Sequence, residues 1–124
     1  MVARLFVRLL AVLAFVFAMS VAQPAYATAL TVDSVTCVIT GYYAPDPTHY
    51  GTYSCTANAS GGTGTYTNYR WTVFTWCCGD PYFGSGQTVY GNCAWGTYRF
   101  HNVTVTDSSG ATAGGAGNIN CAHP

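Results

Sequence analysis

The chain has 124 residues, no lysine and no glutamate, and its four arginines balance its four aspartates to a formal net charge of zero. A nucleic-acid-binding protein needs a basic surface that releases counterions from the phosphates, and so few arginines cannot supply one. The composition therefore excludes nucleic acid as a partner.

Residues 1–27 have the three parts of a secretory signal peptide. Arg4 and Arg8 lie in the basic segment, an apolar stretch runs from about Leu9 to Ala22, and Ala25-Tyr26-Ala27 has the pattern of a cleavage site. The apolar stretch is short for a membrane span of ~20 residues, so we expect cleavage and no membrane contact afterwards.

The expected mature chain, residues 28–124, is long enough for one compact domain and too short for two. It retains Arg70 and Arg99 against the four aspartates, which gives a formal net charge of −2. Hydroxyl and amide side chains must solvate a surface so poor in charge. Binding to an extracellular polymer and self-association are both compatible with such a surface.

Alternating side chains predict a first strand from Leu30 to Thr40, with a kink near Asp33. The segment from Tyr42 to Tyr50 carries two prolines and several tyrosines, and we expect it to be an exposed loop. Alternation returns from Tyr53 to Ala59, which predicts a second strand with one polar and one apolar face.

The segment from Tyr66 to Trp76 is predicted to be the third strand, and it carries aromatic residues on both of its faces. Aromatic residues on both faces indicate a central strand. Turns are expected at Gly79-Asp80-Pro81 and at Gly84-Ser85-Gly86, and a short strand at Gln87 to Tyr90.

The last part of the chain predicts two more strands, the final one from Ala111 to Cys121. In the earlier one, Tyr98 and Phe100 are out of phase with Val103 and Val105, and a β-bulge near His101 or Asn102 would bring both pairs to one face. Six or seven short strands with no helix after residue 27 favour an all-β sandwich of two sheets over a barrel.

Six cysteines in a short exported chain predict three disulfides, and six cysteines allow 15 connectivities. They are Cys37, Cys55, Cys77, Cys78, Cys93 and Cys121. We expect Cys37 to bond with Cys55, Cys93 with one of the adjacent pair, and Cys121 with the other. The cysteines lack the C-x-x-C spacing of a metal site, and no metal is predicted.

Three segments carry a resemblance to a known family. They are Cys55-Thr-Ala-Asn-Ala-Ser-Gly-Gly-Thr-Gly-Thr-Tyr66 followed by Tyr69-Arg-Trp71, Gly96-x-Tyr98-x-Phe100, and Val103-Thr-Val105-Thr-Asp107-Ser-Ser-Gly110. They resemble the immunoglobulin-like domain of the PKD type found in exported bacterial proteins, over about half of the expected mature chain.

This resemblance implies that Trp71 and Tyr98 are structural core residues. Phe100 is also expected in the core, and it occupies the position where antibody domains have the second cysteine of their inter-sheet bridge. The extra cysteines and the tyrosine-rich segment depart from the PKD pattern. Such domains are mostly adhesive, spacer or polysaccharide-associated modules, so the resemblance implies a binding or accessory role.

No catalytic or cofactor site is predicted. His49, His101 and His123 are scattered, and three of the four aspartates, Asp46, Asp80 and Asp107, lie in expected turns. A turn aspartate usually bonds to nearby backbone N–H groups, so the turn interpretation is favoured over a catalytic carboxylate pair. Whether a weak calcium site exists in a loop is left open.

Aromatic residues are more numerous than a core of this size readily buries, and rings with a polar tip are common at binding surfaces. The candidate binding residues are Tyr42, Tyr43, Tyr50, Trp76 and Tyr82. The hypothesis is a secreted, non-enzymatic module that binds an extracellular polysaccharide or protein. The alternatives are that the tyrosines merely fill strand faces, and that a disulfide-held Cys77 to Cys93 loop acts as an inhibitor or toxin on a protein target.

Overall fold

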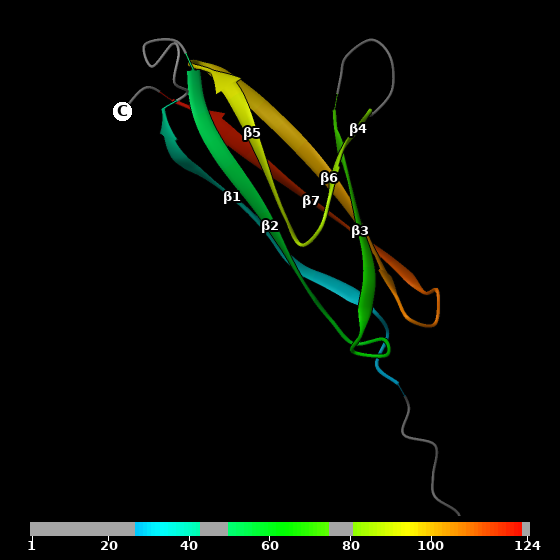
Figure 1. The fold of residues 1–124 in the computed structure, drawn as a ribbon. Coiled ribbons are helices and arrows are strands. Elements are labelled where there is room, and N and C mark those ends of the chain that lie inside the picture. The colour runs from blue at the N-terminus through cyan, green and yellow to red at the C-terminus, as the bar shows by residue number, and fades with distance from the viewer. Residues whose placement is uncertain (1–26, 43–49, 75–80, 123–124) are drawn as a thin grey trace, which may run out of the picture.

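The computed structural model describes residues 27–42, 50–74 and 81–122, and its trace is shown in Figure 1. This part of the chain is all-β. Its seven strands are β1 (Thr31–Tyr42), β2 (Tyr50–Ser60), β3 (Tyr66–Val73), β4 (Tyr82–Ser85), β5 (Thr88–Ala94), β6 (Thr97–Asp107) and β7 (Thr112–Cys121).

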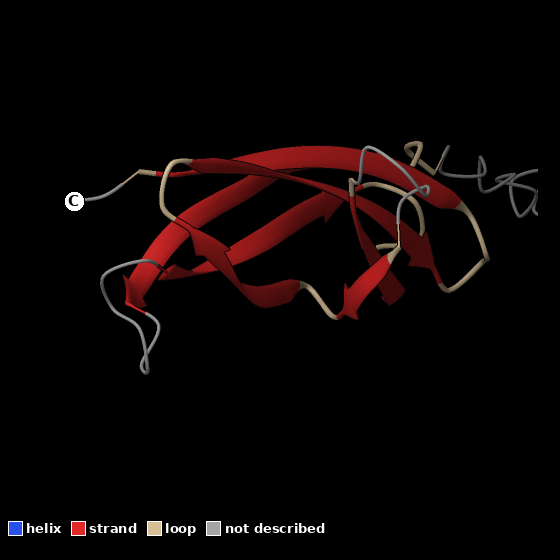
Figure 2. Cartoon of the chain, turned by 90° about the horizontal axis from the view of Figure 1, so that it is seen from above, coloured by secondary structure: helices blue, strands red, loops and turns tan. Residues whose placement is uncertain are grey.

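The strands form two antiparallel sheets, one with the order β1-β2-β5 and the other with the order β4-β3-β6-β7. Figure 2 shows the layers from above. The expected all-β architecture with two sheets is confirmed. The central position of the third strand is also confirmed, because β3 has a neighbour on each side.

The core lies between the sheets, and Trp71 on β3 is its largest fully buried side chain. The Trp71 indole Nε1 donates a hydrogen bond of 2.8 Å to the carbonyl oxygen of Gly86. The ring thus buries its apolar body while its polar atom keeps a partner, as a buried tryptophan requires. The prediction that Trp71 is a core residue is confirmed.

The kink predicted near Asp33 is confirmed, because the pairing of β1 with β2 shifts between Val32 and Ser34. The ends of the expected tyrosine-rich loop differ from the prediction, since Tyr42 and Tyr50 belong to β1 and β2. Residues 43–49 lie outside the described ranges.

The turn expected over Gly84-Ser85-Gly86 is only partly correct. Gly84 and Ser85 belong to β4, and the chain reverses at Gly86, whose positive φ of 96° suits glycine. The following strand is longer than predicted, because β5 continues through Gly91 to Ala94.

The β-bulge expected near His101 is absent, and Tyr98 and Phe100 are not core residues. The pairing of β6 with β7 is continuous from Thr97 to Thr106. His101 therefore stays in phase with Val103 and Val105 and is buried, whereas Tyr98 is 60% exposed and Phe100 is 48% exposed. Sequence reasoning placed the more apolar side chain inside, but the strict alternation of a regular strand decides the facing.

One of the expected disulfides is confirmed and the other pairings are wrong. Cys37 bonds with Cys55 across β1 and β2. Cys93 bonds with Cys121, which links β5 of one sheet to β7 of the other, so neither cysteine bonds with the adjacent pair. Cys77 and Cys78 lie outside the described residues. Because Cys93 bonds with Cys121, no bond between Cys93 and the adjacent pair closes the Cys77 to Cys93 loop, and the inhibitor or toxin alternative stays a hypothesis.

The glycines of β7 allow the sheets to approach on one side of the sandwich. A Cβ atom on Gly115 would lie 2.5 Å from Val32, and one on Gly117 would lie 2.6 Å from Val35. The role of these glycines is to leave room for the valines of β1, so that the edge strands β1 and β7 pack together.

Candidate functional site

The outer face of the four-stranded sheet carries a group of exposed aromatic rings, here called the aromatic face. Its members are Phe74, Tyr82, Tyr98 and Phe100, all exposed by 42% to 60%. They come from β4, β6 and the residue that follows β3.

The register of the strands places these rings on the same side. Phe74 donates its backbone N–H to the carbonyl oxygen of Phe100 at 2.9 Å, so the two residues are cross-strand neighbours. Tyr98 and Phe100 are two positions apart on β6, and their ring centroids lie 6.4 Å apart with planes inclined by 20°. Residues opposite each other, or two apart on one strand, project from the same face of a sheet.

Tyr82 joins the aromatic face from β4. It pairs with Thr72, which alternates with the buried Trp71 and therefore faces outward. The guanidinium carbon of Arg70 lies 5.8 Å from the centroid of the Tyr82 ring, which is within cation–π distance.

Amide side chains border the rings on the β7 side. Asn118 pairs with Phe100 and Asn120 with Tyr98, and both asparagines are exposed. The surface thus combines aromatic rings with neutral hydrogen-bonding groups.

The residues predicted to form one binding platform are divided between the two sheets. Tyr42 and Tyr50 lie at adjoining ends of β1 and β2 in the three-stranded sheet, whereas Tyr82 lies in the four-stranded sheet. Tyr42 packs edge-on against Trp95, with the ring centroids 6.1 Å apart. Tyr43 and Trp76 lie outside the described residues. Sequence reasoning missed Phe74, Tyr98 and Phe100, although counting the alternation of β6 from Val103 without a bulge places Tyr98 and Phe100 outside.

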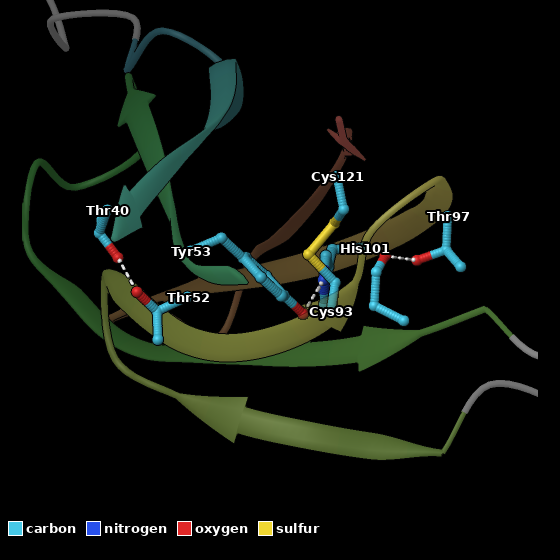
Figure 3. Close-up of a disulfide and its surroundings, with 8 residues drawn as sticks. Thr40, Thr52, Tyr53, Cys93, Thr97, His101 and Cys121 are labelled. Atoms are coloured by element: carbon cyan, nitrogen blue, oxygen red, sulfur yellow. Dashed lines mark hydrogen bonds between the residues drawn. A yellow bond between two sulfur atoms is a disulfide. The ribbon is translucent and has the colours of Figure 1, made fainter. Parts of the chain in front are cut away.

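The core between the sheets contains a pair of buried polar side chains, His101 on β6 and Tyr53 on β2. Figure 3 shows the 2.8 Å hydrogen bond between the Tyr53 hydroxyl and His101 Nε2, close to the Cys93–Cys121 disulfide. The Phe83 ring centroid lies 4.6 Å from that of His101. Within the described part of the chain, His101 Nδ1 has no hydrogen-bond partner.

Burial and the positive charge of Arg99 lower the pKa of His101 below its ordinary value of 6.5. Burial also raises the pKa of Tyr53, with Arg99 opposing that change. The pair is therefore neutral at pH 7. It ties the two sheets together through a hydrogen bond between their inner strands.

The aspartate of the last turn has the structural role expected for it. The Oδ1 atom of Asp107 accepts hydrogen bonds from the backbone N–H groups of Ser109 and Ala111 and from the Ser109 hydroxyl, and Oδ2 accepts one from the N–H of Thr63. Such carboxylate bonds fix a turn. Among the described residues, no three His, Cys, Asp or Glu side chains gather as metal ligands would.

Comparison with family models, with curated proteins and with solved structures gives no significant match for this chain. No helix in the described ranges has the length and apolar character that a membrane span requires.

Proposed function

We propose that this protein is a secreted, non-enzymatic binding module that recognises an extracellular polysaccharide through the aromatic face. The observation that carries the proposal is that Phe74, Tyr82, Tyr98 and Phe100 project from one face of one sheet, with Asn118 and Asn120 beside them.

Sugar rings have apolar C–H faces and polar hydroxyl edges. Aromatic rings offer large contact areas to such faces at low entropic expense, and amide groups donate and accept hydrogen bonds with hydroxyl groups. Among the described residues, Arg70 is the charged side chain that lies beside the aromatic face, and the bordering Asn118 and Asn120 are neutral, which suits an uncharged polymer better than an ionic one. The two disulfides are compatible with an extracellular location.

We further propose that the sandwich is immunoglobulin-like and of the PKD type. The strand orders β1-β2-β5 and β4-β3-β6-β7, with a buried tryptophan on the third strand, support this assignment. The exposure of Tyr98 departs from the resemblance, which implied a buried tyrosine at this position.

The test is a binding assay of the purified secreted protein against a panel of insoluble polysaccharides and cell walls. The variant Tyr98→Ala/Phe100→Ala removes two exposed rings and should reduce saturable binding at least 10-fold, because both rings belong to the proposed contact surface. Val38→Ala is the control, since Val38 is 49% exposed on the three-stranded sheet. All variants should retain the wild-type far-UV circular dichroism and a cooperative thermal transition.

Three results would contradict the proposal. Binding that survives in the Tyr98 and Phe100 variant would exclude the aromatic face. Binding that is lost only in Tyr42→Ala/Tyr50→Ala would move the site to the three-stranded sheet. Failure to bind any polymer, together with capture of one purified extracellular protein through the same rings, would assign the surface to a protein target.

A further inference from the structure

The sandwich has one closed side and one open side. On the closed side, the edge strands β1 and β7 pack against each other, with Gly115 and Gly117 leaving room for Val32 and Val35. On the other side, β5 ends the three-stranded sheet and β4 ends the four-stranded sheet. Figure 1 shows β4 and β5 joined by a turn and then separating into their two sheets.

Soluble β-proteins usually protect sheet edges with short strands, bulges, prolines, charges or covering elements. β1 has two register shifts and contains Asp33. β4 has four residues and a register shift against β3. β7 is covered by β1.

Within the described ranges, β5 has none of these protections. It has seven residues without proline or charge, and its pairing with β2 is regular from Tyr50 opposite Ala94 to Thr56 opposite Thr88. The described residues place no strand on its other side. Tyr90, the third residue of β5, is 74% exposed.

The backbone groups that face the open edge can be identified from one hydrogen bond. The Gln87 carbonyl oxygen accepts a 3.0 Å bond from the N–H of Ala57 on β2. Hydrogen-bonding directions alternate along an antiparallel strand, so Val89 and Gly91 also face β2. The N–H and C=O groups of Thr88, Tyr90 and Asn92 therefore point to the open edge.

We propose that this edge is the contact between two copies of the protein, with the two β5 strands antiparallel about a two-fold axis at Tyr90. This arrangement makes one continuous six-stranded sheet from the two three-stranded sheets. It is an isologous contact, in which the same surface is used by both partners.

The sequence of β5 is complementary to itself in that register. Thr88 lies opposite Asn92 of the partner copy, which pairs a hydroxyl with an amide on the outer face. Val89 lies opposite Gly91 of the partner copy, which sets a larger side chain against a glycine on the inner face, and the two Tyr90 rings are cross-strand neighbours. The strand has no charge, so no like charges meet at this edge.

The test is sedimentation equilibrium of the purified oxidised protein from about 1 µM to 1 mM, and we expect a reversible dimer. Tyr90→Pro removes an N–H that faces the open edge without removing a bond to β2, and it should raise the dimer dissociation constant more than 10-fold. Thr88→Lys should have the same effect by placing a charge on the edge, and it serves as the second variant should proline disturb β5.

Thr36→Lys is the matched control. Thr36, Thr56 and Thr88 form one row across the outer face of the sheet, so the same charge is introduced on the far edge strand, β1, and should leave the dimer intact. Oxidative tyrosine coupling followed by mass spectrometry should give a Tyr90–Tyr90 cross-link in the dimer. A monomer throughout the concentration range, or a dimer unaffected by both β5 variants, would overturn the proposal. Neither result depends on polysaccharide binding.

Discussion

The Tyr53 hydroxyl on β2 and the His101 imidazole on β6 form a 2.8 Å hydrogen bond between inner strands of the two sheets. Both side chains are essentially inaccessible to solvent. Protonation of His101 would place a charge in a site with Tyr53 as its hydrogen-bond partner and with the positive Arg99 nearby. This relationship makes the stability of the sandwich sensitive to mild acid.

The stability should fall as the pH drops below about 6.5. The pKa of His101 is lower in the folded protein than in the unfolded chain, so between the two pKa values the unfolded chain binds a proton that the folded protein does not. Stability is fully present above the unfolded pKa and decreases by up to ~1.4 kcal/mol per pH unit in that window. Thermal melts between pH 7.5 and 5 measure this change, and His101→Leu should flatten the profile. An equally steep profile in the variant would assign the effect to another group.

Asp107→Asn should lower the melting temperature at pH 7. An amide cannot replace both acceptor oxygens of the carboxylate, so the N–H of Thr63 or of Ala111 loses its partner. The pKa of Asp107 is held below its ordinary value of 3.8, first by the hydrogen bond from the Ser109 hydroxyl. The stabilisation is therefore present above pH 3.8 and is lost as the pH falls through the lower folded pKa. The difference in melting temperature between the wild-type protein and Asp107→Asn should decrease as the pH falls through the folded pKa of Asp107. A difference in melting temperature that does not change with pH would contradict this account.

Gly117→Ala should destabilise the protein by about 1 to 3 kcal/mol, because the added methyl group would overlap Val35 where β1 and β7 pack together. Gly114→Ala is the matched control on the same strand, since its Cβ would have no neighbour closer than 3.9 Å. Urea denaturation of both variants provides the measurement. Equal stability of the two would mean that the closed side of the sandwich is not tightly packed.

Removing the Cys93–Cys121 disulfide with Cys93→Ala/Cys121→Ala should lower the free energy of unfolding by about 3 to 4 kcal/mol, because this bond closes a segment with a sequence separation of 28 residues. Peptide mapping of the unreduced wild-type protein should recover the Cys93–Cys121 pair directly. A fragment joining Cys93 to Cys77 or Cys78 would refute this connectivity.

The strand periodicity and the kink at Asp33 could be predicted from the sequence because they depend on neighbouring residues. The prediction that Tyr98 and Phe100 project into the core was wrong, because local hydrophobicity favoured burying the phenylalanine. The long-range pairing of β6 with β7 kept a regular register and buried His101 instead. The partner of Cys93 was also beyond local reasoning, since β5 and β7 belong to different sheets and only the tertiary fold brings their cysteines together.

The positions of the two arginines have a practical consequence for proteolysis. Trypsin cleaves after lysine or arginine, and in residues 28–124 this leaves Arg70 on β3 and Arg99 on β6, two paired strands of the four-stranded sheet. A protease must bind a locally extended and detached segment, which a paired strand does not offer until it opens. Tryptic digestion at these two bonds therefore reports directly on how often the four-stranded sheet opens, without any introduced label.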